Sequence, residues 1–434
     1  MLLNIPKGTR DFSSIEINKR NYLIQTIRKQ FELFGFYPIE TPSIENISTL
    51  VGKYGEEGDY LMFKLLHSGN FLKKISNKAL RYDLTVPFVR YVVMHKNKIV
   101  FPFKRYQIQP VWRADKPQKG RFREFYQCDA DIISFSWSLW EEIELIQLCD
   151  EIFTKLNFPI IIYINHRDIL GGLLEMAGIE NNLWKDFTTS LDKWNKIGRN
   201  LVKKEMLYKG ISSKSFDKVA FFFDMEENFY NKEKHLTVAL QDSEKGKKGI
   251  RDLSFIYKNI NNISLQNTKL EWNLSLARGM NYYTGTILEI VPFNRSVSIG
   301  GGGRYDQLAN LFGINNISGV GISLGLDRIY LAMEQTNFFQ TIPSKVLFIN
   351  FGNEEVLYAY TIIKFLRKKG ISTQLYPNAD KIGKQFRYAN DNNIPFAISI
   401  GKNEIKKNKI RMKDLKKRTE KEYDSINDVV NQLT

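Results

Sequence analysis

Polar and apolar residues alternate over residues 104–131, and this alternation predicts two β-strands joined by a charged loop at residues 114–120. Successive side chains of a strand point to opposite faces. The polar face of the first strand carries Arg105, Gln107, Gln109 and Arg113, together with Val111. The corresponding face of the second strand carries Arg121, Arg123, Phe125, Gln127, Asp129 and Asp131. A solvated hairpin would show the same alternation, but two adjoining polar strands favour the floor of a site for an anionic ligand.

Apolar residues at helical spacing precede and follow this hairpin. Between residues 17 and 34 they form one stripe, made of Leu23, Ile24, Ile27, Phe31 and Phe34. Ordinary packing against a core explains such a stripe, and a self-associating surface is the alternative. Residues 139–153 form a second predicted helix. Closer to the hairpin, Arg81, Asp83 and Thr85 alternate on a predicted strand, which is followed by a helical run.

The composition and hydrophobic pattern of the chain change twice near its centre. Residues 160–164 read as a buried strand, whereas residues 166–260 are rich in Lys and Asn at helical spacing and predict an inserted helical module. Strands return from residue 271 and lead to the glycine run Gly300 to Gly303, after which a helix is predicted near Arg304. Consecutive glycines let the backbone approach a ligand or a neighbouring strand closely.

A strand of small residues then leads into a helix with Arg328 in its first turn. The positive end of that helix and the guanidinium can both face a phosphate. Past a linker that contains Pro343, residues 345–434 alternate strands and helices, which predicts a separate small α/β domain. Its basic run from Lys402 to Lys421 suits either a phosphate backbone or a solvated edge.

Composition narrows the class of protein. A chain of 434 residues, 43% of them hydrophobic, is long enough for two or three globular domains. No run of about 18 apolar residues predicts a transmembrane helix, and the N-terminus is unlike a signal peptide. Two cysteines and four scattered histidines argue against a disulfide framework or a zinc cluster and fit a reducing cytoplasm. The net charge of +16 favours a polyanionic partner, although a Lys-, Asn- and Ile-rich composition alone would also produce it.

Several ordered motifs resemble those of the histidyl-tRNA synthetases, which are class II aminoacyl-tRNA synthetases. PKGTRDF resembles the N-terminal signature of that family, and GFYPIETP resembles the first class II motif, which lies at the dimer interface. VWRAD with GRFREFYQCDAD resembles the second motif, and GVGISLGLDRIY resembles the third. ARGMNYYTG and GGGRYDQL resemble the two histidine-specific motifs. The resemblance covers the whole chain, apart from the detail of residues 166–260.

The resemblance implies an α+β protein with a class II antiparallel-sheet catalytic domain, built from residues 1–165 and 261–340 and interrupted by a helical insertion at residues 166–260. It implies that residues 345–434 form an α/β anticodon-binding domain. The implied activity is the ATP-dependent ligation of L-histidine to tRNA(His) through a histidyl-adenylate. The implied ligands and partners are ATP, Mg²⁺, L-histidine, tRNA(His) and a second copy of the chain in a cytoplasmic homodimer, with no membrane partner.

The positions that match the family's ATP-binding residues are Arg113, Asp115, Arg121, Phe125 and Arg328. By resemblance, Arg113 would hold the α-phosphate, and Arg121 and Arg328 would hold the outer phosphates. Phe125 would stack on adenine, and Asp115 would accept a hydrogen bond from the adenine amine. Mg²⁺ would bridge the phosphates, and the sequence does not identify protein ligands for it.

The positions that match the family's histidine-binding residues are Asp83, Leu84, Thr85, Gln127, Asp131, Arg278, Tyr282 and Tyr283. The resemblance places acceptors for the α-ammonium at Asp83, Thr85 and Gln127. It places the groups that read the imidazole at Asp131 and Tyr283. Arg278 would lie between the histidine carboxylate and the α-phosphate, and would share the catalytic role with Arg113.

The resemblance implies that the loop at residues 114–120 and its flanks contact the acceptor end of tRNA, with candidates Gln118, Lys119 and Arg123. Two positions depart from the family. Asn281 stands where the family usually has Asp, and an amide cannot balance the charge of Arg278. Asp83 stands where many bacterial members have Glu, and the surrounding RYDLTVPFVRY is closer to the archaeal and eukaryotic branch, although the loop KPQKG is of bacterial type.

Two other functions are compatible with this framework. A non-catalytic paralogue would act as a regulatory or sensor subunit, for example the regulatory subunit of ATP phosphoribosyltransferase. The C-terminal domain argues against the regulatory subunit, and retention of Gln127 and of the arginines at positions 113, 121, 278 and 328 argues against any non-catalytic paralogue. A class II enzyme for another amino acid would lack the pair YYTG and GGGRYD.

Overall fold

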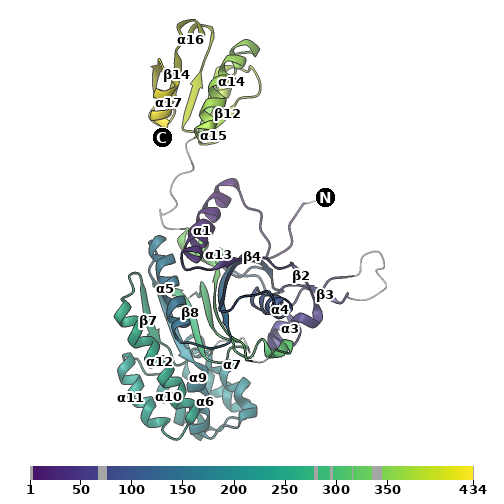
Figure 1. The fold of residues 1–434 in the computed structure, drawn as a ribbon, viewed down its shortest axis with the longest axis vertical. Helices are drawn as coiled ribbons and strands as arrows, with labels where there is room; N and C mark the ends of the chain where they lie inside the picture. The colour runs from purple at the N-terminus through teal and green to yellow at the C-terminus, as the bar shows by residue number, and fades with distance from the viewer. Residues whose placement is uncertain are drawn as a thin grey trace. The chain divides into compact units, whose positions relative to one another are not determined.

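The computed structural model describes residues 3–66, 76–277, 282–293, 297–314, 316–334 and 345–433. The chain divides into two compact units, Met1–Phe339 and Gln340–Thr434 (Figure 1). Within the described residues no helix is long and apolar enough to cross a membrane.

An eight-stranded sheet organises the first unit, in the order β1-β4-β5-β10-β9-β8-β6-β7. Its strands are β1 (Tyr37–Pro38), β4 (Phe103–Trp112), β5 (Glu124–Ser134), β6 (Ile160–His166), β7 (Thr268–Trp272), β8 (Thr286–Pro292), β9 (Gly300–Arg304) and β10 (Ser318–Gly325). All neighbouring pairs are antiparallel except β1 with β4 and β6 with β7. A separate pair, β2 (Ile44–Asn46) and β3 (Lys78–Leu80), forms a two-stranded sheet. The predicted antiparallel-rich α+β fold is therefore confirmed.

Further helices accompany these strands in the first unit. They are α1 (Ser14–Leu33), α2 (Ile47–Leu50), α3 (Gly55–Tyr60), α4 (Thr85–His95), α5 (Trp140–Lys155) and α13 (Leu326–Met333). A capping box between Ser13 and Glu16 starts α1. The apolar stripe of α1 buries Leu23, Ile27 and Phe31 in the core, so ordinary packing explains it.

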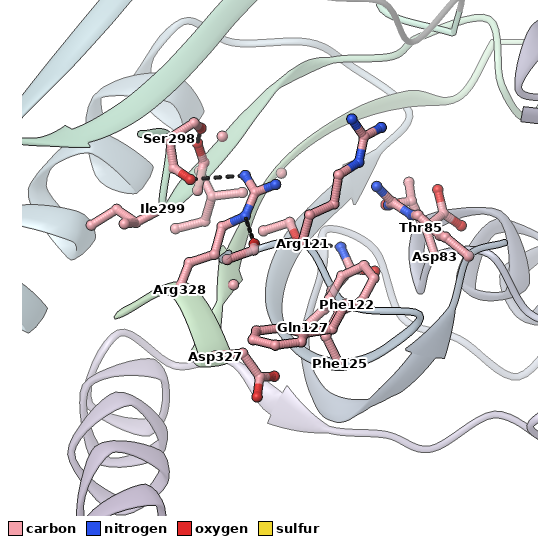
Figure 2. Close-up of a pocket in the computed structure, with 18 of the residues that line it drawn as sticks. Asp83, Thr85, Arg121, Phe122, Phe125, Gln127, Ser298, Ile299, Asp327 and Arg328 are labelled. Carbon is pink, nitrogen blue, oxygen red and sulfur yellow. Dashed lines mark hydrogen bonds between the residues drawn. The ribbon is translucent and has the colours of Figure 1, made fainter. Parts of the chain in front are cut away.

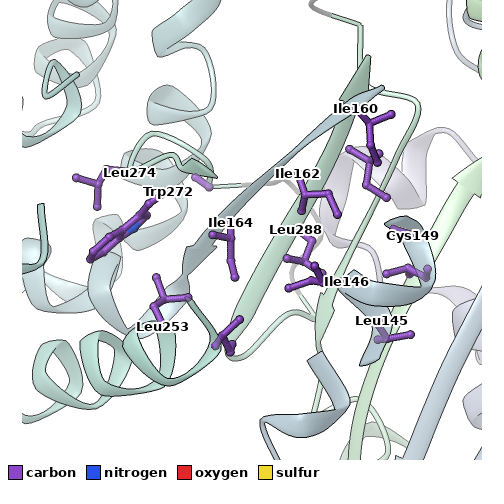
Figure 3. Packing of buried hydrophobic residues seen from close by; sticks show 14 of the residues in the cluster. Leu145, Ile146, Cys149, Ile160, Ile162, Ile164, Leu253, Trp272, Leu274 and Leu288 are labelled. Carbon is purple, nitrogen blue, oxygen red and sulfur yellow. The ribbon is translucent and has the colours of Figure 1, made fainter. Parts of the chain in front are cut away.

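Residues 167–263 are helical, as predicted. They form α6 (Arg167–Ala177), α7 (Trp184–Leu191), α8 (Trp194–Ile197), α9 (Arg199–Tyr208), α10 (Ser213–Phe223), α11 (Phe229–Ala239) and α12 (Glu244–Ile263), with a short 3₁₀ turn at Asn181–Leu183. Figure 3 shows Leu253 of α12 near Ile164 and Trp272 of the sheet, in one continuous apolar cluster that also includes Leu145 of α5. This segment therefore shares its core with the sheet, and the boundaries of an insertion at residues 166–260 stay a prediction.

The second unit is a smaller α/β structure with its own five-stranded sheet, in the order β12-β11-β13-β14-β15. Its strands are β11 (Lys345–Phe348), β12 (Ser372–Leu375), β13 (Phe396–Ser399), β14 (Ile410–Asp414) and β15 (Thr419–Tyr423). Its helices are α14 (Asn353–Lys368), α15 (Ile382–Asp391), α16 (Lys402–Lys407) and α17 (Ile426–Leu433). The first three strands are parallel, and β14 and β15 add an antiparallel hairpin.

Two local predictions are wrong. Residues 81–84 are not a strand. Thr85 begins α4 after the N-cap residue Leu84, and the Asp83 carboxylate accepts a hydrogen bond from the Val86 N–H (3.1 Å), a free donor of the first turn. No helix begins at Arg304, which instead ends strand β9. The glycines keep this segment in the sheet, since a Cβ at Gly302 would lie 2.1 Å from the Gly321 carbonyl oxygen of β10.

The contact between α6 and α12 gives a matched test of packing. A Cβ added at Gly172 would lie 2.8 Å from Gly246 Cα, whereas its neighbour Gly171 meets only Lys245 Cδ at 3.9 Å. We expect Gly172→Ala to lower the free energy of unfolding by about 1–3 kcal/mol. Gly171→Ala should raise it by up to about 1 kcal/mol, because alanine is the better helix former. Urea unfolding followed by circular dichroism measures both, and equal effects would contradict the packing.

Candidate active site

A cavity of about 330 Å³ opens over the polar face of the β4–β5 hairpin. The predicted site residues that line it are Asp83, Thr85, Arg113, Asp115, Arg121, Phe125, Gln127, Asp131, Tyr282, Tyr283 and Arg328. Figure 2 shows Asp83 and Thr85 at one end of the cavity and Arg328 with Ser298 at the other. One end of the cavity is therefore acidic, and the other carries guanidinium groups.

Strand register brings the polar residues of the floor together. Arg105 of β4 lies opposite Asp131 of β5, and Gly321 of β10 lies on the other side of Asp131. A Cβ at Gly321 would come within 2.0 Å of an Asp131 carboxylate oxygen, so the glycine makes room for that side chain. Arg105 and Asp131 are almost fully buried. The solvated hairpin, left open by the sequence, is thereby excluded.

Asp83 marks the acidic end. Its carboxylate is 2% exposed and accepts hydrogen bonds from the hydroxyl groups of Tyr54 (2.9 Å) and Tyr282 (3.4 Å), in addition to the Val86 N–H. Burial raises the pKa of Asp83, and the Val86 hydrogen bond and the charge of Arg113 offset part of that rise. A cationic group placed beside Asp83 would favour its ionised form.

Two more buried carboxylates share one guanidinium. Arg105 forms an ion pair with Asp131 (2.8 Å), and Asp131 also accepts a hydrogen bond from Tyr305. Asp129, two residues away on the same face of β5, is 1% exposed. Burial raises the pKa of Asp129 and of Asp131, and Arg105 opposes this rise in both. Burial therefore outweighs the charge of Arg105 at both acids.

Gln127, Tyr282 and Tyr283 complete the lining of the acidic end of the cavity. Gln127 Nε2 donates to Ser323 Oγ of β10 (2.5 Å). Tyr282 and Tyr283 reach the cavity from the chain before β8, and their rings lie 4.9 Å apart. Leu84 is fully buried and is not among the lining residues, but its carbonyl oxygen accepts from Arg105 (3.4 Å).

Aromatic rings and backbone carbonyls hold the arginines that line the cavity, and the charge of one of them, Arg113, also acts on Asp83 of the acidic end. Arg113 donates to the Tyr82 carbonyl (3.1 Å), and its guanidinium carbon lies 5.2 Å from the Phe125 ring centroid. Arg121 pairs with Asp115 at 2.8 Å. Arg328 donates to the carbonyl oxygens of Gly120 (3.0 Å) and Ser298 (2.9 Å), as the dashed lines in Figure 2 show.

Gln118, Lys119 and Arg123 do not line the cavity. Gln118 and Lys119 are exposed at the tip of the hairpin loop. The Arg123 side chain donates to the backbone carbonyls of Asp115 (3.1 Å) and Lys7 (3.3 Å). Arg278 and Asn281 lie outside the described residues.

Comparison with known proteins identifies the family of this chain. The profile of the family described as Histidyl-tRNA synthetase matches residues 8–329. The chain belongs to the histidyl-tRNA synthetase family. The profile described as Anticodon binding domain matches residues 345–434 of this histidyl-tRNA synthetase family member.

Similar proteins agree with this membership. The Histidine--tRNA ligase of Christiangramia forsetii is 52% identical over 95% of each chain, and that of Flavobacterium johnsoniae is 51% identical over 95% of each chain. The crystal structure of histidyl-tRNA synthetase from Nostoc sp. PCC 7120 covers 100% of both chains with a TM-score of 0.85 and 30% identity. The similarity of residues 81–91 to the archaeal and eukaryotic branch is not tested by these relatives and stays a prediction.

The regulatory alternative is not favoured. A Bacillus halodurans chain described as an ATP phosphoribosyltransferase regulatory subunit/histidyl-tRNA synthetase has a TM-score of 0.73 but only 20% identity, which shows the shared fold alone. The relatives at about 50% identity carry the ligase name instead.

Several lining residues were not predicted from the sequence: Phe122, Ser298, Ile299, Tyr305, Gly321, Ser323 and Asp327. Tyr305 belongs to the histidine-specific motif GGGRYDQL, so the motif already pointed to it. Ser298 and Ile299 precede β9 and carry no local signal, because only the pairing of β9 with β10 brings them near Arg328.

Among the described residues, no group of three or more His, Cys, Asp or Glu side chains is placed to hold a metal ion. The side chains at the basic end are mainly arginines, and the Asp115 carboxylate there is paired with Arg121. The described protein groups therefore do not form a metal site by themselves.

The buried Asp129 predicts a pH dependence of stability. Its pKa is higher in the folded chain than in the unfolded chain, so the folded state retains a proton that the unfolded state loses as pH rises above about 4. Stability should therefore fall as pH rises from there toward the raised pKa. Asp129→Asn removes this titration. The free energy of unfolding of the variant minus that of the unmodified protein should therefore rise with pH, by at most about 1.4 kcal/mol per pH unit.

Urea unfolding at pH 5, 6 and 7 measures this difference. Asp391→Asn, at an exposed position of α15, is the control and should follow the unmodified protein. Parallel pH curves for Asp129→Asn and the unmodified protein would contradict the buried-acid account.

Proposed function

We propose that this chain charges tRNA(His) with L-histidine in two steps, through a histidyl-adenylate. The observation that carries the proposal is the two-ended cavity, with buried acids at one end and guanidinium groups at the other. A cationic amino acid fits the first end and a polyphosphate fits the second. Family membership, with Histidine--tRNA ligases as relatives at about 50% identity, supports the same reading.

In the proposed complex, the acidic end binds histidine. Asp83 faces the α-ammonium, with Thr85 and Gln127 as further acceptors, and Asp131 and Tyr283 read the imidazole. Burial raises the pKa of Asp83 and of Asp131, and this supports the assignment, because a cationic ligand would offset the cost of burying these acids. Polar recognition of this kind rejects apolar analogues strongly, so no editing domain is needed.

The basic end binds ATP in this proposal. Arg113 faces the α-phosphate, Phe125 stacks on adenine, and Arg121 and Arg328 face the outer phosphates. In the unliganded protein Arg121 is paired with Asp115, and Arg328 is held by loop carbonyls, so both must exchange these partners for phosphate oxygens. When the histidine carboxylate attacks the α-phosphate in line, positive charge placed at the developing negative charge lowers the barrier.

Arg278 is proposed, by its place in the family motif, to share that charge stabilisation with Arg113. Mg²⁺ is proposed to accompany ATP, with the phosphates as its ligands, and no catalytic step is assigned to it. The exposed loop residues Gln118 and Lys119, with Arg123 behind them, are proposed to meet the acceptor end of tRNA. The second unit would bind the anticodon, which its match to the anticodon-binding family supports.

A homodimer is also proposed. The first class II motif includes β1, which is an outermost strand of the large sheet; Tyr37 of β1 and Leu33 at the end of α1 are each 69% exposed. An uncovered sheet edge with large apolar side chains suits a protein interface. We expect a solution mass of twice the chain mass of 50.7 kDa.

The double substitution Leu33→Glu with Tyr37→Glu should convert the dimer to monomers in analytical ultracentrifugation, because two buried charges would oppose association. Phe221→Glu, at an exposed apolar position of α10, is the control and should leave the mass unchanged. A monomeric unmodified protein would refute the homodimer.

Histidine-dependent exchange of pyrophosphate into ATP tests the function directly. We expect exchange with L-histidine and none with other amino acids. Absence of exchange with every amino acid would refute the enzyme, whereas exchange with a different amino acid would refute only the specificity.

The same assay tests the acidic end. Asp83→Asn keeps the shape of the side chain but removes its charge. We expect the KM for histidine to rise roughly 10- to 100-fold, as for the loss of one charge-assisted hydrogen bond, while the KM for ATP changes little. A thermal unfolding curve close to that of the unmodified protein ensures that the variant is folded. An unchanged KM for histidine would remove Asp83 from the ammonium site.

A further inference from the structure

The N-terminal segment Pro6–Phe12 packs against the hairpin loop of the cavity. Arg123 N–H donates to the Gly8 carbonyl (2.8 Å), and the Arg123 side chain donates to the Lys7 carbonyl (3.3 Å). Gly8 has φ +89°, and an added Cβ there would lie 2.8 Å from Arg123 Cγ and 3.0 Å from Pro117 Cγ. The segment and the loop are therefore in direct contact.

Arg10 extends this contact to the cavity wall. Its guanidinium carbon lies 3.5 Å from the ring centroid of Phe122, within cation–π range, and the same guanidinium forms an ion pair with Asp327. Asp327 is 2% exposed, and it also accepts from Arg20 of α1 (2.5 Å) and from the Tyr126 N–H of β5 (2.8 Å). One carboxylate thus joins the N-terminal segment, α1, β5 and the start of α13.

Phe122 and Asp327 both line the cavity, and each is the immediate neighbour of an arginine proposed to hold phosphates. Phe122 follows Arg121, and Arg328 follows Asp327. Figure 2 shows the Asp327 side chain directed away from that of Arg328, which itself reaches the Gly120 carbonyl. The loop is therefore held to α13 from two sides, by Arg328 and by Arg10.

We propose that Arg10 is a positioning residue of the ATP site, which fixes the spacing between Arg121 and Arg328 through Phe122 and Asp327. This inference rests on the proposed ATP-binding role of the basic end. Phosphate binding by two arginines from different segments requires both to be held at the correct separation. The N-terminal segment, to which the sequence assigned no role, supplies that restraint from outside the cavity.

A purely structural role for Arg10 predicts a different outcome. If Arg10 only anchored α13 to the rest of the unit, its loss would lower stability and change the KM of both substrates alike. Arg20 keeps a positive charge on Asp327 when Arg10 is removed, so an Arg10 variant retains a partner for the buried carboxylate. The two roles are separable by the ratio of the two KM values.

Pyrophosphate exchange by the full chain tests the inference. We expect Arg10→Ala to raise the KM for ATP about tenfold, the scale of losing one charged contact, and to change the KM for histidine less than twofold. Arg10→Lys keeps the charge but not the planar group over Phe122. Its KM for ATP should lie between those of the unmodified protein and Arg10→Ala. Lys7→Ala is the control, because only the backbone carbonyl of Lys7 makes the contact with Arg123, and it should match the unmodified protein.

Calorimetric titration with ATP, with no histidine present, gives a readout that does not depend on turnover, and Arg10→Ala should weaken ATP binding by a similar factor. Equal changes in the KM of both substrates, or unchanged ATP binding, would overturn the positioning role. If the unmodified protein bound ATP but supported no exchange with histidine, the proposed function would be wrong. The calorimetric comparison would still test the positioning role of Arg10 in ATP binding.

Discussion

The guanidinium of Arg105 is the interaction around which the floor of the cavity is built. It pairs with Asp131 of β5, donates to the Leu84 carbonyl ahead of α4 and lies 4.1 Å from the Phe88 ring of that helix. Three segments of the chain therefore meet at one buried cation. The charge of Arg105 lowers the pKa of both Asp129 and Asp131, but burial raises the pKa of each by more. The folded site therefore holds acids whose protonated forms are favoured. A bound cation would relieve that cost of burial and would therefore couple stability to the binding of a cationic ligand.

The opposite end of the cavity depends on a carboxylate in the same way. Asp327 receives hydrogen bonds from Arg10, Arg20 and the backbone of Tyr126, so its charge is fully paired. The two ends therefore differ in charge balance. At the acidic end burial keeps the pKa values of the carboxyl groups raised despite the arginines near them, whereas at the basic end Asp327 is paired and Arg121 and Arg328 lie at the cavity wall. An asymmetric cavity of this kind suits a substrate pair of opposite charge.

The local pattern of polar and apolar residues predicted an element correctly where burial of one face alone decides its structure. Alternation over residues 104–131 predicted the hairpin and its polar face, and apolar spacing predicted α1 and α5, because burial of one face decides both. It was wrong where a second influence prevailed. At Asp83 a hydrogen bond to the first turn of α4 prevailed over the alternation, and at Arg304 the pairing of glycines with β10 kept the chain extended. Neither a hydrogen bond to a side chain three residues away nor pairing with a distant strand is visible in a local period.

By itself, the sequence determined the order of the motifs, the residue types available for chemistry and the separate α/β unit at the C-terminus. Only the tertiary structure decided which of these residues meet. Tyr282 reaches Asp83 across 199 positions of the chain, and Arg10 reaches Asp327 across 317. The placement of β10 between β5 and β9 brings Ser323 to Gln127 and leaves room for Asp131. Such contacts follow from the non-sequential strand order, which the whole core selects and no short stretch of sequence contains.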